Sequence, residues 1–261
     1  MARVLAIANQ KGGVGKTTTS VNLAASLNAT KRRVLLIDLD PQGNATMGSG
    51  INKAELENSL YEVLMGECTA REAIMQTPGG CDILPANGDL TAAEIALLQE
   101  DGRETRLRDI IAGLADQYDY IVIDCPPSLN MLTINALVAA DGVIIPMQCE
   151  YYALEGLSAL MDTIGAISAT LNPALQIEGI LRTMYDPRSK LTLEVSGQLF
   201  THFGDKVYRT VVPRNIRLAE APSYGMPVLH YDRQSRGAVA YLALAGEMLR
   251  RNEQRQSRQA G

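Results

Sequence analysis

Short apolar segments alternate with segments of helical periodicity along nearly the whole chain. The apolar segments, which predict strands, are residues 4–8, 34–38, 81–84, 120–124, 142–147, 177–184 and 207–212. The segments with helical periodicity are residues 16–29, 104–117, 129–139, 153–171, 189–203 and 237–251. Most of the predicted strands lack polar alternation, which is typical of strands buried on both faces. The pattern predicts an α/β fold, a doubly wound and mostly parallel sheet with helices on both faces.

The same pattern predicts one domain, residues 1–249, in the chain of 261 residues. Residues 250–261 are polar and lack bulky apolar side chains, so we expect a flexible basic tail. Because there is no run of about 18 apolar residues and residues 4–8 are too short for a signal peptide, we expect a cytoplasmic protein. The four cysteines lack CxxC spacing, which favours buried free thiols over ligands of an iron–sulfur cluster.

Charge is distributed unevenly along the chain. Residues 1–205 contain 14 Lys and Arg against 25 Asp and Glu, whereas residues 206–261 contain 10 against 4. The formal net charge of −5 therefore conceals a basic C-terminal fifth on an acidic body. Such a segment suits an anionic partner such as nucleic acid or anionic lipid, and it is equally compatible with a solvated basic surface.

The segment NQKGGVGKTTT, residues 9–19, predicts a phosphate-binding loop between the first strand and the first helix. Its end matches the G-x-x-x-x-G-K-[ST] pattern, although Gln10 stands where that pattern begins with glycine. Backbone N–H groups at a helix N-terminus bind phosphate oxygens, Lys16 would span the β- and γ-phosphates, and Thr17 would ligate Mg²⁺. The residues expected around the phosphates are Gly12, Gly13, Val14, Gly15, Lys16, Thr17 and Thr18.

Lys11 is a second lysine in this loop. Because it precedes the helix, it need not fold onto its own phosphates and can point outward to a second subunit. A lysine of this kind would tie dimerisation to the γ-phosphate, whereas the plain alternative is a solvent-exposed loop residue.

Acidic residues follow two of the predicted strands. Asp124 is the last residue of the predicted strand 120–124, so its carboxylate would emerge beside the phosphate loop and could hold Mg²⁺. The alternative is that Asp124 caps the next helix. Asp38 and Asp40 lie at the end of the predicted strand 34–38, where either could cap a turn or, beside the loop, orient an attacking water.

Four segments together resemble a known family: KGGVGKTTT, DLDPQGN, YIVIDCPPS and PRNIRLAEAPSYGMPV. In order and spacing the chain, up to about Leu249, is similar to the deviant-Walker P-loop ATPases, and specifically to the ParA/Soj chromosome-partitioning ATPases. The resemblance implies that Lys16 and Thr17 bind nucleotide and Mg²⁺. It also implies that Lys11 reaches ATP bound in the other subunit of a dimer, and that Asp40 is needed for hydrolysis.

Further site residues are implied only by the resemblance. Asp38 and Asp124 would be associated with Mg²⁺ in the two switch regions. Pro213, Arg214 and Asn215 would pack near the adenine.

The resemblance also implies an output for the ATPase. An ATP-bound sandwich dimer would bind DNA without sequence preference, and a ParB/Spo0J-like partner would stimulate its weak hydrolysis and release it from the nucleoid. The basic C-terminal region makes this plausible, because affinity for DNA depends steeply on the number of phosphate contacts. The residues expected to contact DNA are Lys206, Arg209 and Arg217, within a basic region that begins at Arg182.

The main alternative is a membrane-associated positioning ATPase of the MinD type, which shares the nucleotide-binding residues. It would need a C-terminal amphipathic helix with bulky apolar residues, and the last such residue here is Leu249. An electron-transfer ATPase of the nitrogenase iron-protein type would need ligating cysteines, and Cys125 has no suitable companion. A metabolic P-loop ligase or kinase would need a substrate site, for which we find no motif. The sequence favours a partitioning ATPase that does not bind membranes.

Overall fold

The computed structural model describes residues 2–151 and 153–259, and it contains one eight-stranded sheet. The strands are β1 (Arg3–Ile7), β2 (Val34–Asp38), β3 (Met75–Gln76), β4 (Asp82–Leu84), β5 (Tyr120–Asp124), β6 (Gly142–Gln148), β7 (Gln176–Tyr185) and β8 (Val207–Pro213). Their order in the sheet is β3-β4-β2-β5-β1-β6-β7-β8. Only the β3–β4 pair is antiparallel in the part of the chain that the structure describes. The predicted mostly parallel, doubly wound sheet is confirmed.

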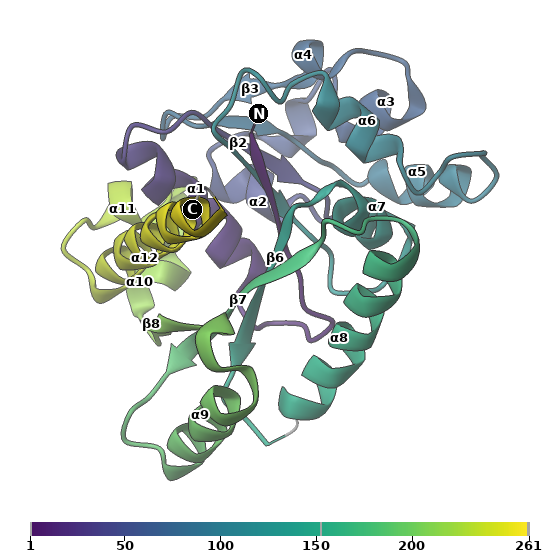
Figure 1. Cartoon of the computed structure of the whole chain (residues 1–261). Coiled ribbons are helices and arrows are strands. Elements are labelled where there is room, and N and C mark those ends of the chain that lie inside the picture. The colour runs from purple at the N-terminus through teal and green to yellow at the C-terminus, as the bar shows by residue number, and fades with distance from the viewer. Residues whose placement is uncertain (1, 152, 260–261) are drawn as a thin grey trace.

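Helices cover both faces of this sheet (Figure 1). They are α1 (Lys16–Ala29), α2 (Asn44–Gly48), α3 (Leu60–Met65), α4 (Ala70–Ala73), α5 (Leu90–Leu97), α6 (Arg106–Ala112), α7 (Met131–Ala139), α8 (Ala153–Thr170), α9 (Lys190–Phe203), α10 (Ile216–Glu220), α11 (Val228–Tyr231) and α12 (Arg236–Gln259). Three 3₁₀ turns, η1 (Lys53–Glu55), η2 (Gly204–Lys206) and η3 (Ala221–Tyr224), complete the described elements.

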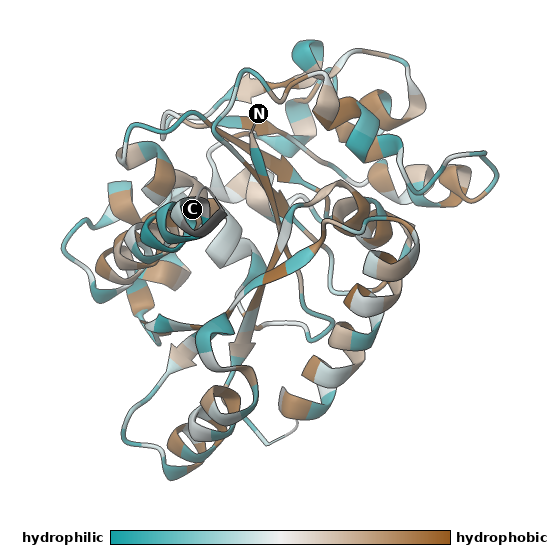
Figure 2. Cartoon of the chain, in the orientation of Figure 1, coloured by the Kyte–Doolittle hydropathy of each residue, from teal (hydrophilic) through white to brown (hydrophobic). Residues whose placement is uncertain are grey.

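Two hydrophobic cores lie on opposite faces of the sheet, because side chains along a strand point alternately to either face. In β1, Val4 and Ala6 belong to the core beneath α3 and α5–α9, whereas Leu5 and Ile7 belong to the core beneath α1 and α10–α12. The central strands are accordingly mostly apolar and lie between the helical layers (Figure 2). This packing explains the missing alternation in the sequence.

The register of the central strands brings their carboxyl ends to one level. Asp124 of β5 is paired with Ile7 of β1 on one side and with Asp38 of β2 on the other. The loop that follows β1 and the two carboxylates therefore emerge at the same sheet edge. This edge, where the chain switches between the two faces, is where open α/β sheets bind ligands.

Residues 250–259, for which we expected a flexible tail, are helical and continue α12 to Gln259. Arg251 donates hydrogen bonds to the carbonyls of Asp205 and Val207 and pairs with Glu247 one turn earlier at 2.6 Å. Arg255 pairs at 2.6 Å with the buried Glu178 at the start of β7. Polar composition indicated disorder, but these arginines find acceptors on strands far away in the sequence. Residues 260 and 261 of the predicted tail lie outside the described part.

Glu247 is the residue that fastens α12 to the last strand. Its carboxylate accepts hydrogen bonds from the backbone N–H groups of Arg209 and Thr210, both at 2.8 Å, and from the Thr210 hydroxyl at 2.7 Å. Burial acts to raise the pKa of Glu247, but these hydrogen bonds and Arg251 outweigh it, so the pKa lies below its usual value.

Glu247→Gln is expected to lower the free energy of unfolding at pH 7 by about 1–3 kcal/mol, because two backbone donors lose a charged acceptor. A carboxylate with a lowered folded pKa stabilises the protein above its unfolded pKa, near 4.5, and loses that effect as the pH falls through the folded pKa. Urea unfolding of wild type and variant should therefore converge in acid. Glu253→Gln, at an exposed position of the same helix, is the control, and an equal loss there would contradict the prediction.

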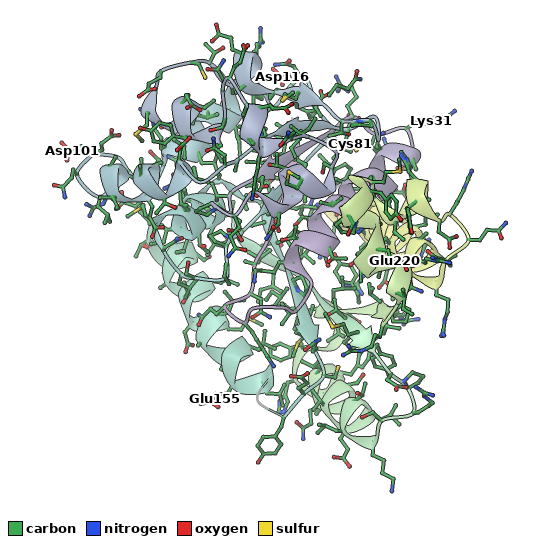
Figure 3. All side chains as sticks on the ribbon, turned by 180° about the vertical axis from the view of Figure 1, so that it is seen from behind. Lys31, Cys81, Asp101, Asp116, Glu155 and Glu220 are labelled. Carbon is green, nitrogen blue, oxygen red and sulfur yellow. The ribbon has the colours of Figure 1, made fainter. Side chains whose placement is uncertain are left out.

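The cysteines are free thiols, as predicted. Cys81, Cys125 and Cys149 are buried, whereas Cys68 is only half-buried. Figure 3 shows Cys81 within the body of the molecule. Within residues 2–151 and 153–259, no group of three or more His, Cys, Asp or Glu side chains could hold a metal ion.

Candidate active site

The loop after β1 has the backbone of a phosphate-binding turn. Gly13 and Gly15 have φ values of 72° and 88°, in the left-handed region that other residues rarely adopt. Gly15 is the N-cap of α1 and supplies no side-chain cap, so the first N–H groups of the helix are open to an anion. The predicted loop residues are thus brought together at the N-terminus of α1.

Two residues that the motif does not contain hold this loop. The Asn9 amide donates to the Pro146 carbonyl of β6 at 2.8 Å and accepts from the Lys11 N–H at 3.0 Å. The Thr183 hydroxyl, at the end of β7, donates to the Val14 carbonyl at 2.7 Å. Sequence reasoning missed both; Asn9 could have been suspected from its place in the loop, but Thr183 carries no local signal.

Lys16 is folded into the loop and is only 7% exposed. Its ammonium donates to the Lys11 carbonyl at 3.2 Å, so the side chain curls back over the N-terminus of α1. Burial lowers the pKa of Lys16, while the carboxylates of Asp124 and Asp40 oppose that shift. The charge is therefore enclosed beside the open N–H groups, where a phosphate would be held.

Asp124 is fully buried at the end of β5. Its Oδ1 accepts from the Ser20 hydroxyl at 2.7 Å, whereas its Oδ2 is buried and has no hydrogen-bond partner among the described residues. Burial and the charge of Asp38 raise the pKa of Asp124, and hydrogen bonds from the Ser20 and Thr17 side chains oppose this. The unpartnered Oδ2 of Asp124 and the Thr17 hydroxyl are both hard oxygen donors, which fits Mg²⁺.

Asp38 is also fully buried, but its oxygens are largely occupied. The Thr46 N–H and hydroxyl both donate to Oδ2 at 2.8 Å, and the Asp40 N–H donates to Oδ1 at 3.2 Å. These contacts fill three of about four acceptor positions of the carboxylate. Asp38 therefore anchors the loop to α2, and its contact with Mg²⁺ stays a prediction that this geometry does not favour.

Asp40 lies in the loop after β2 and is 8% exposed. Its Oδ1 accepts from the Gln42 N–H at 3.0 Å, as in the turn that the sequence allowed. The second carboxylate oxygen, Oδ2, accepts no hydrogen bond from the described residues, so it is available to a water.

The Lys11 side chain points away from the loop, unlike that of Lys16. It is exposed, and its ammonium pairs at 2.6 Å with Glu150, which follows β6 and is itself exposed. The side chain therefore does not cover the N-terminus of α1. Both the trans role and the plain solvated role of Lys11 require this outward placement.

A cavity of about 200 Å³ lies beside the loop and includes all three residues predicted to pack near adenine. It is lined by Gly15, Thr18, Thr183, Met184, Val212, Pro213, Arg214, Asn215, Leu218, Ala219 and Tyr241. The Oδ1 atom of Asn215 is buried without a hydrogen-bond partner among the described residues. An unpaired carbonyl oxygen in a mostly apolar cavity suits the amino group of an adenine ring.

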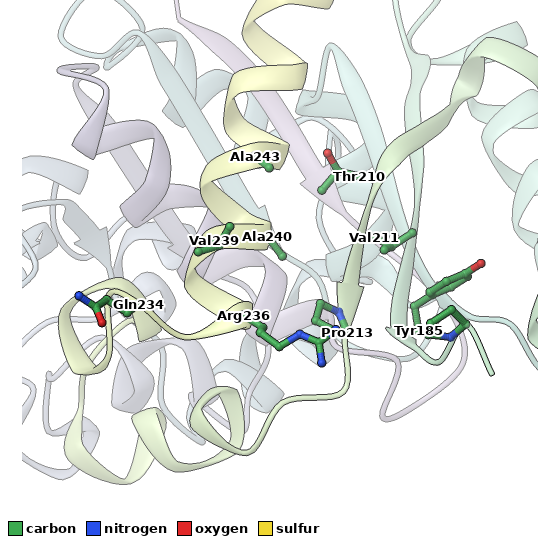
Figure 4. A pocket seen from close by; sticks show the side chains of 10 residues that line it. Tyr185, Thr210, Val211, Pro213, Gln234, Arg236, Val239, Ala240 and Ala243 are labelled. Carbon is green, nitrogen blue, oxygen red and sulfur yellow. The ribbon is translucent and has the colours of Figure 1, made fainter. Parts of the chain in front are cut away.

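A larger cavity, of about 570 Å³, lies between β8 and α12 (Figure 4). Val239, Ala240 and Ala243 line it from the helix, and Val211 lines it from the strand. No residue of the phosphate loop reaches it. Although this cavity is larger, it is separate from the phosphate loop, so we do not assign the nucleotide to it.

The basic residues expected on DNA lie in different environments. Lys206 and Arg209 are exposed, whereas Arg217 pairs with Glu220 at 2.7 Å and with Asp232 at 3.3 Å. Arg182, which the sequence placed in the same region, is buried and hydrogen-bonded to Ser196 of α9 and to two carbonyls of β8. It joins structural elements and cannot contact a partner.

Comparisons with known proteins identify the family to which this chain is similar. A family model described as an AAA domain matches residues 2–177. The chromosome partitioning protein ParA of Caulobacter vibrioides is 52% identical over 99% of this chain and 98% of its own length. The sporulation initiation inhibitor protein Soj of Bacillus subtilis is 53% identical over 95% and 98%.

Among solved structures, cobyrinic acid a,c-diamide synthase from Mycobacterium smegmatis with bound ATP analog and magnesium is 40% identical, with a TM-score of 0.86 over 97% of this chain and 96% of that one. The cell division ATPase MinD of Pyrococcus furiosus is 27% identical, with a TM-score of 0.80 over 96% and 99%. From the matched motifs, the fold and the full-length relatives, the chain belongs to the ParA/Soj family of chromosome-partitioning ATPases.

Proposed function

We propose that this ATPase segregates DNA: two copies bind ATP and Mg²⁺, form a sandwich dimer, and the dimer binds DNA without sequence preference until hydrolysis releases it. The partitioning relatives and the ATP analog and magnesium in the Mycobacterium smegmatis structure support the proposal. The observation that carries it is the opposite placement of two lysines in one loop. Lys16 is folded over the N-terminus of α1, and Lys11 extends away from it.

Hydrolysis follows from the groups around the loop. The N–H groups of residues 12–18 and the Lys16 ammonium bind the phosphates, and the Asn215 carbonyl oxygen accepts from the base. Mg²⁺, held by the Thr17 hydroxyl and Asp124, would neutralise charge on the β- and γ-phosphates. Asp40 orients the attacking water and accepts its proton at the carboxylate. Little covalent chemistry is needed, because positioning and charge stabilisation supply most of the catalysis.

The dimer completes the site. A cation that contacts the γ-phosphate from a second subunit stabilises the charge that develops in phosphoryl transfer, as an arginine finger does. Lys11 can fill this role only after its ion pair with Glu150 opens. Because both partners of that pair are about half exposed, opening it costs little, on the order of 0–1 kcal/mol.

The DNA-binding surface would lie on η2, β8 and the second half of α12. Arg209 lines a cavity of about 560 Å³ together with Arg250, Arg251 and Arg255. The last two pair with Glu247 and Glu178, whereas Lys206, Arg209 and Arg250 form no ion pair with the described residues. Of the three residues predicted from sequence, Lys206 and Arg209 therefore suit DNA phosphates better than Arg217 does.

A membrane-associated output is less well supported. No helix in residues 2–151 and 153–259 is both long and apolar enough to cross a membrane. Along the described part of α12 beyond Leu249, the exposed side chains are polar: Arg250, Glu253, Gln254 and Ser257. An interfacial helix needs bulky apolar residues on one face. From the resemblance to the ParA/Soj family, the proposal also includes a ParB/Spo0J-like partner that stimulates hydrolysis.

DNA binding is expected to require ATP, to ignore sequence and to weaken steeply with salt. The logarithm of the binding constant should fall against the logarithm of salt concentration, with a slope near 0.9 for each phosphate contact. Arg209→Ala would then reduce the slope by about two per dimer, since each subunit loses one contact. Fluorescence anisotropy with two unrelated duplexes measures this.

Arg71→Ala, an exposed arginine of α4 on another part of the surface, is the matched control. Equal binding of the ADP form, or an unchanged slope for Arg209→Ala, would contradict the proposal. The same assay run beside anionic liposomes separates a membrane output. It also separates a metabolic ligase, the class suggested by the name of the Mycobacterium smegmatis structure, which has no need of ATP-dependent DNA binding.

A further inference from the structure

Thr183 lies outside every motif of the sequence, yet it touches the centre of the phosphate loop. It is 2% exposed, and its hydroxyl donates to the Val14 carbonyl at 2.7 Å, across 169 residues of sequence. Its methyl carbon is 3.9 Å from the point where a side chain on Gly15 would begin. Thr183 is therefore packed directly against the Val14–Gly15 peptide unit.

The orientation of that peptide unit matters for binding. A peptide bond is planar and trans, so its carbonyl and its N–H point in opposite directions. The Val14 carbonyl points to Thr183 on β7, and the Gly15 N–H must therefore point away from β7. Glycine rotates freely about φ, and Gly15 already has a φ of 88°, so the loop alone does little to prevent this unit from turning.

Thr183 itself is held firmly. The preceding residue, Arg182, donates to the Ser196 hydroxyl at 2.7 Å and to the Tyr208 carbonyl at 2.9 Å. Thr183 is paired with Gln148 of β6 in the sheet. A donor fixed by α9, β8 and β6 can impose its geometry on a glycine-rich loop, as supporting residues do around precise sites.

We propose that Thr183 is a positioning residue for nucleotide binding: by holding the Val14 carbonyl, it aims the Gly15 N–H at the triphosphate. This inference rests on the proposed function, in which the loop binds the phosphates of ATP. Loss of the hydroxyl leaves a buried carbonyl without a donor, and the peptide unit turns to find another partner. The N–H then no longer points at the phosphate.

The test compares Thr183→Val, which keeps the shape but removes the hydroxyl, with Thr183→Ser, which keeps the hydroxyl. Titration calorimetry with Mg·ATP is expected to show about tenfold weaker binding for the valine variant and binding within about twofold of wild type for the serine variant. The midpoint of thermal unfolding without nucleotide should change little. Thr163→Val is the control, because that exposed hydroxyl only bonds the Ala159 carbonyl of its own helix at 3.1 Å.

Inorganic triphosphate is the decisive second ligand, because Thr183 also lines the cavity proposed for the base. Its affinity should fall by the same factor as that of ATP if the effect lies at the phosphates. Weaker binding of ATP alone, unchanged binding by Thr183→Val, or failure of serine to restore affinity would each overturn the inference. If Thr183→Val does not fold, Thr183→Ala takes its place under the same criteria. Wild-type protein that binds neither ligand would overturn the proposed function and this inference together.

Discussion

Lys16→Ala is expected to abolish measurable ATP binding, whereas Lys11→Ala is expected to bind ATP normally and to lose ATP-dependent dimers. Lys16 is buried against the loop, and its removal takes away a cation enclosed with the N–H groups that would bind the phosphates. A charge-assisted contact of this kind changes affinity by at least about a hundredfold, on the order of 3 kcal/mol. The Lys11 side chain instead pairs with Glu150, and the backbone contacts of Lys11 in the loop are kept in Lys11→Ala.

Titration calorimetry measures ATP binding, and sedimentation velocity with and without ATP measures dimers. Lys31→Ala is the control, since Lys31 follows the far end of α1 and projects from the surface (Figure 3). Dimers of Lys11→Ala that persist in ATP would rule out the trans role. Weak ATP binding by Lys11→Ala would instead place that lysine in the site of its own subunit.

The second large effect is expected for Asp40→Ala, which should bind ATP, form dimers and remain on DNA because hydrolysis has stopped. Removing a group that orients the water and accepts its proton costs about two to four orders of magnitude in rate. Asp40 also accepts the Gln42 N–H, so alanine loosens the loop as well. Asp40→Asn keeps that acceptor and removes only the charge and the basic oxygen.

Both Asp40 variants should therefore hydrolyse ATP slowly and dissociate slowly from DNA. Phosphate release and the decay of DNA binding after dilution into ATP-free buffer are the measurements. If Asp40→Asn turns over at the wild-type rate while Asp40→Ala does not, the residue holds the loop and is not the group that activates water. Rapid release of both variants with wild-type turnover would contradict any role in hydrolysis.

Sequence reasoning succeeded where the signal is local. Strands buried on both faces give continuous apolar runs, so the sheet could be predicted. The glycine-rich motif between a strand and a helix is recognisable in the sequence, so the phosphate loop could be predicted too. Asp124 was correctly expected beside the loop, because the carboxyl ends of parallel strands lie at one edge of the sheet. The apolar runs and the glycine-rich turn depend on residues close together in the chain.

What the sequence could not show depends on contacts between distant segments. The polar end of α12 looked like a flexible tail because nothing local reveals that Arg255 reaches Glu178. Arg182 looked like a surface cation, although it is buried among acceptors from α9 and β8. Asp38 was expected beside Mg²⁺ together with Asp124, but Thr46, eight residues on, donates two hydrogen bonds to its Oδ2.

The hydrogen bonds of Glu247 also limit how copies of this protein can associate. β8 is an outer strand of the sheet, and an exposed outer strand can recruit a strand from another molecule. Here Glu247 occupies the N–H groups of Arg209 and Thr210, and Pro213 has no N–H to offer. The opposite outer strand, β3, has only two residues. Neither end of the sheet is open to continuous extension, so any array of dimers along DNA has to be built through side chains of helices and loops.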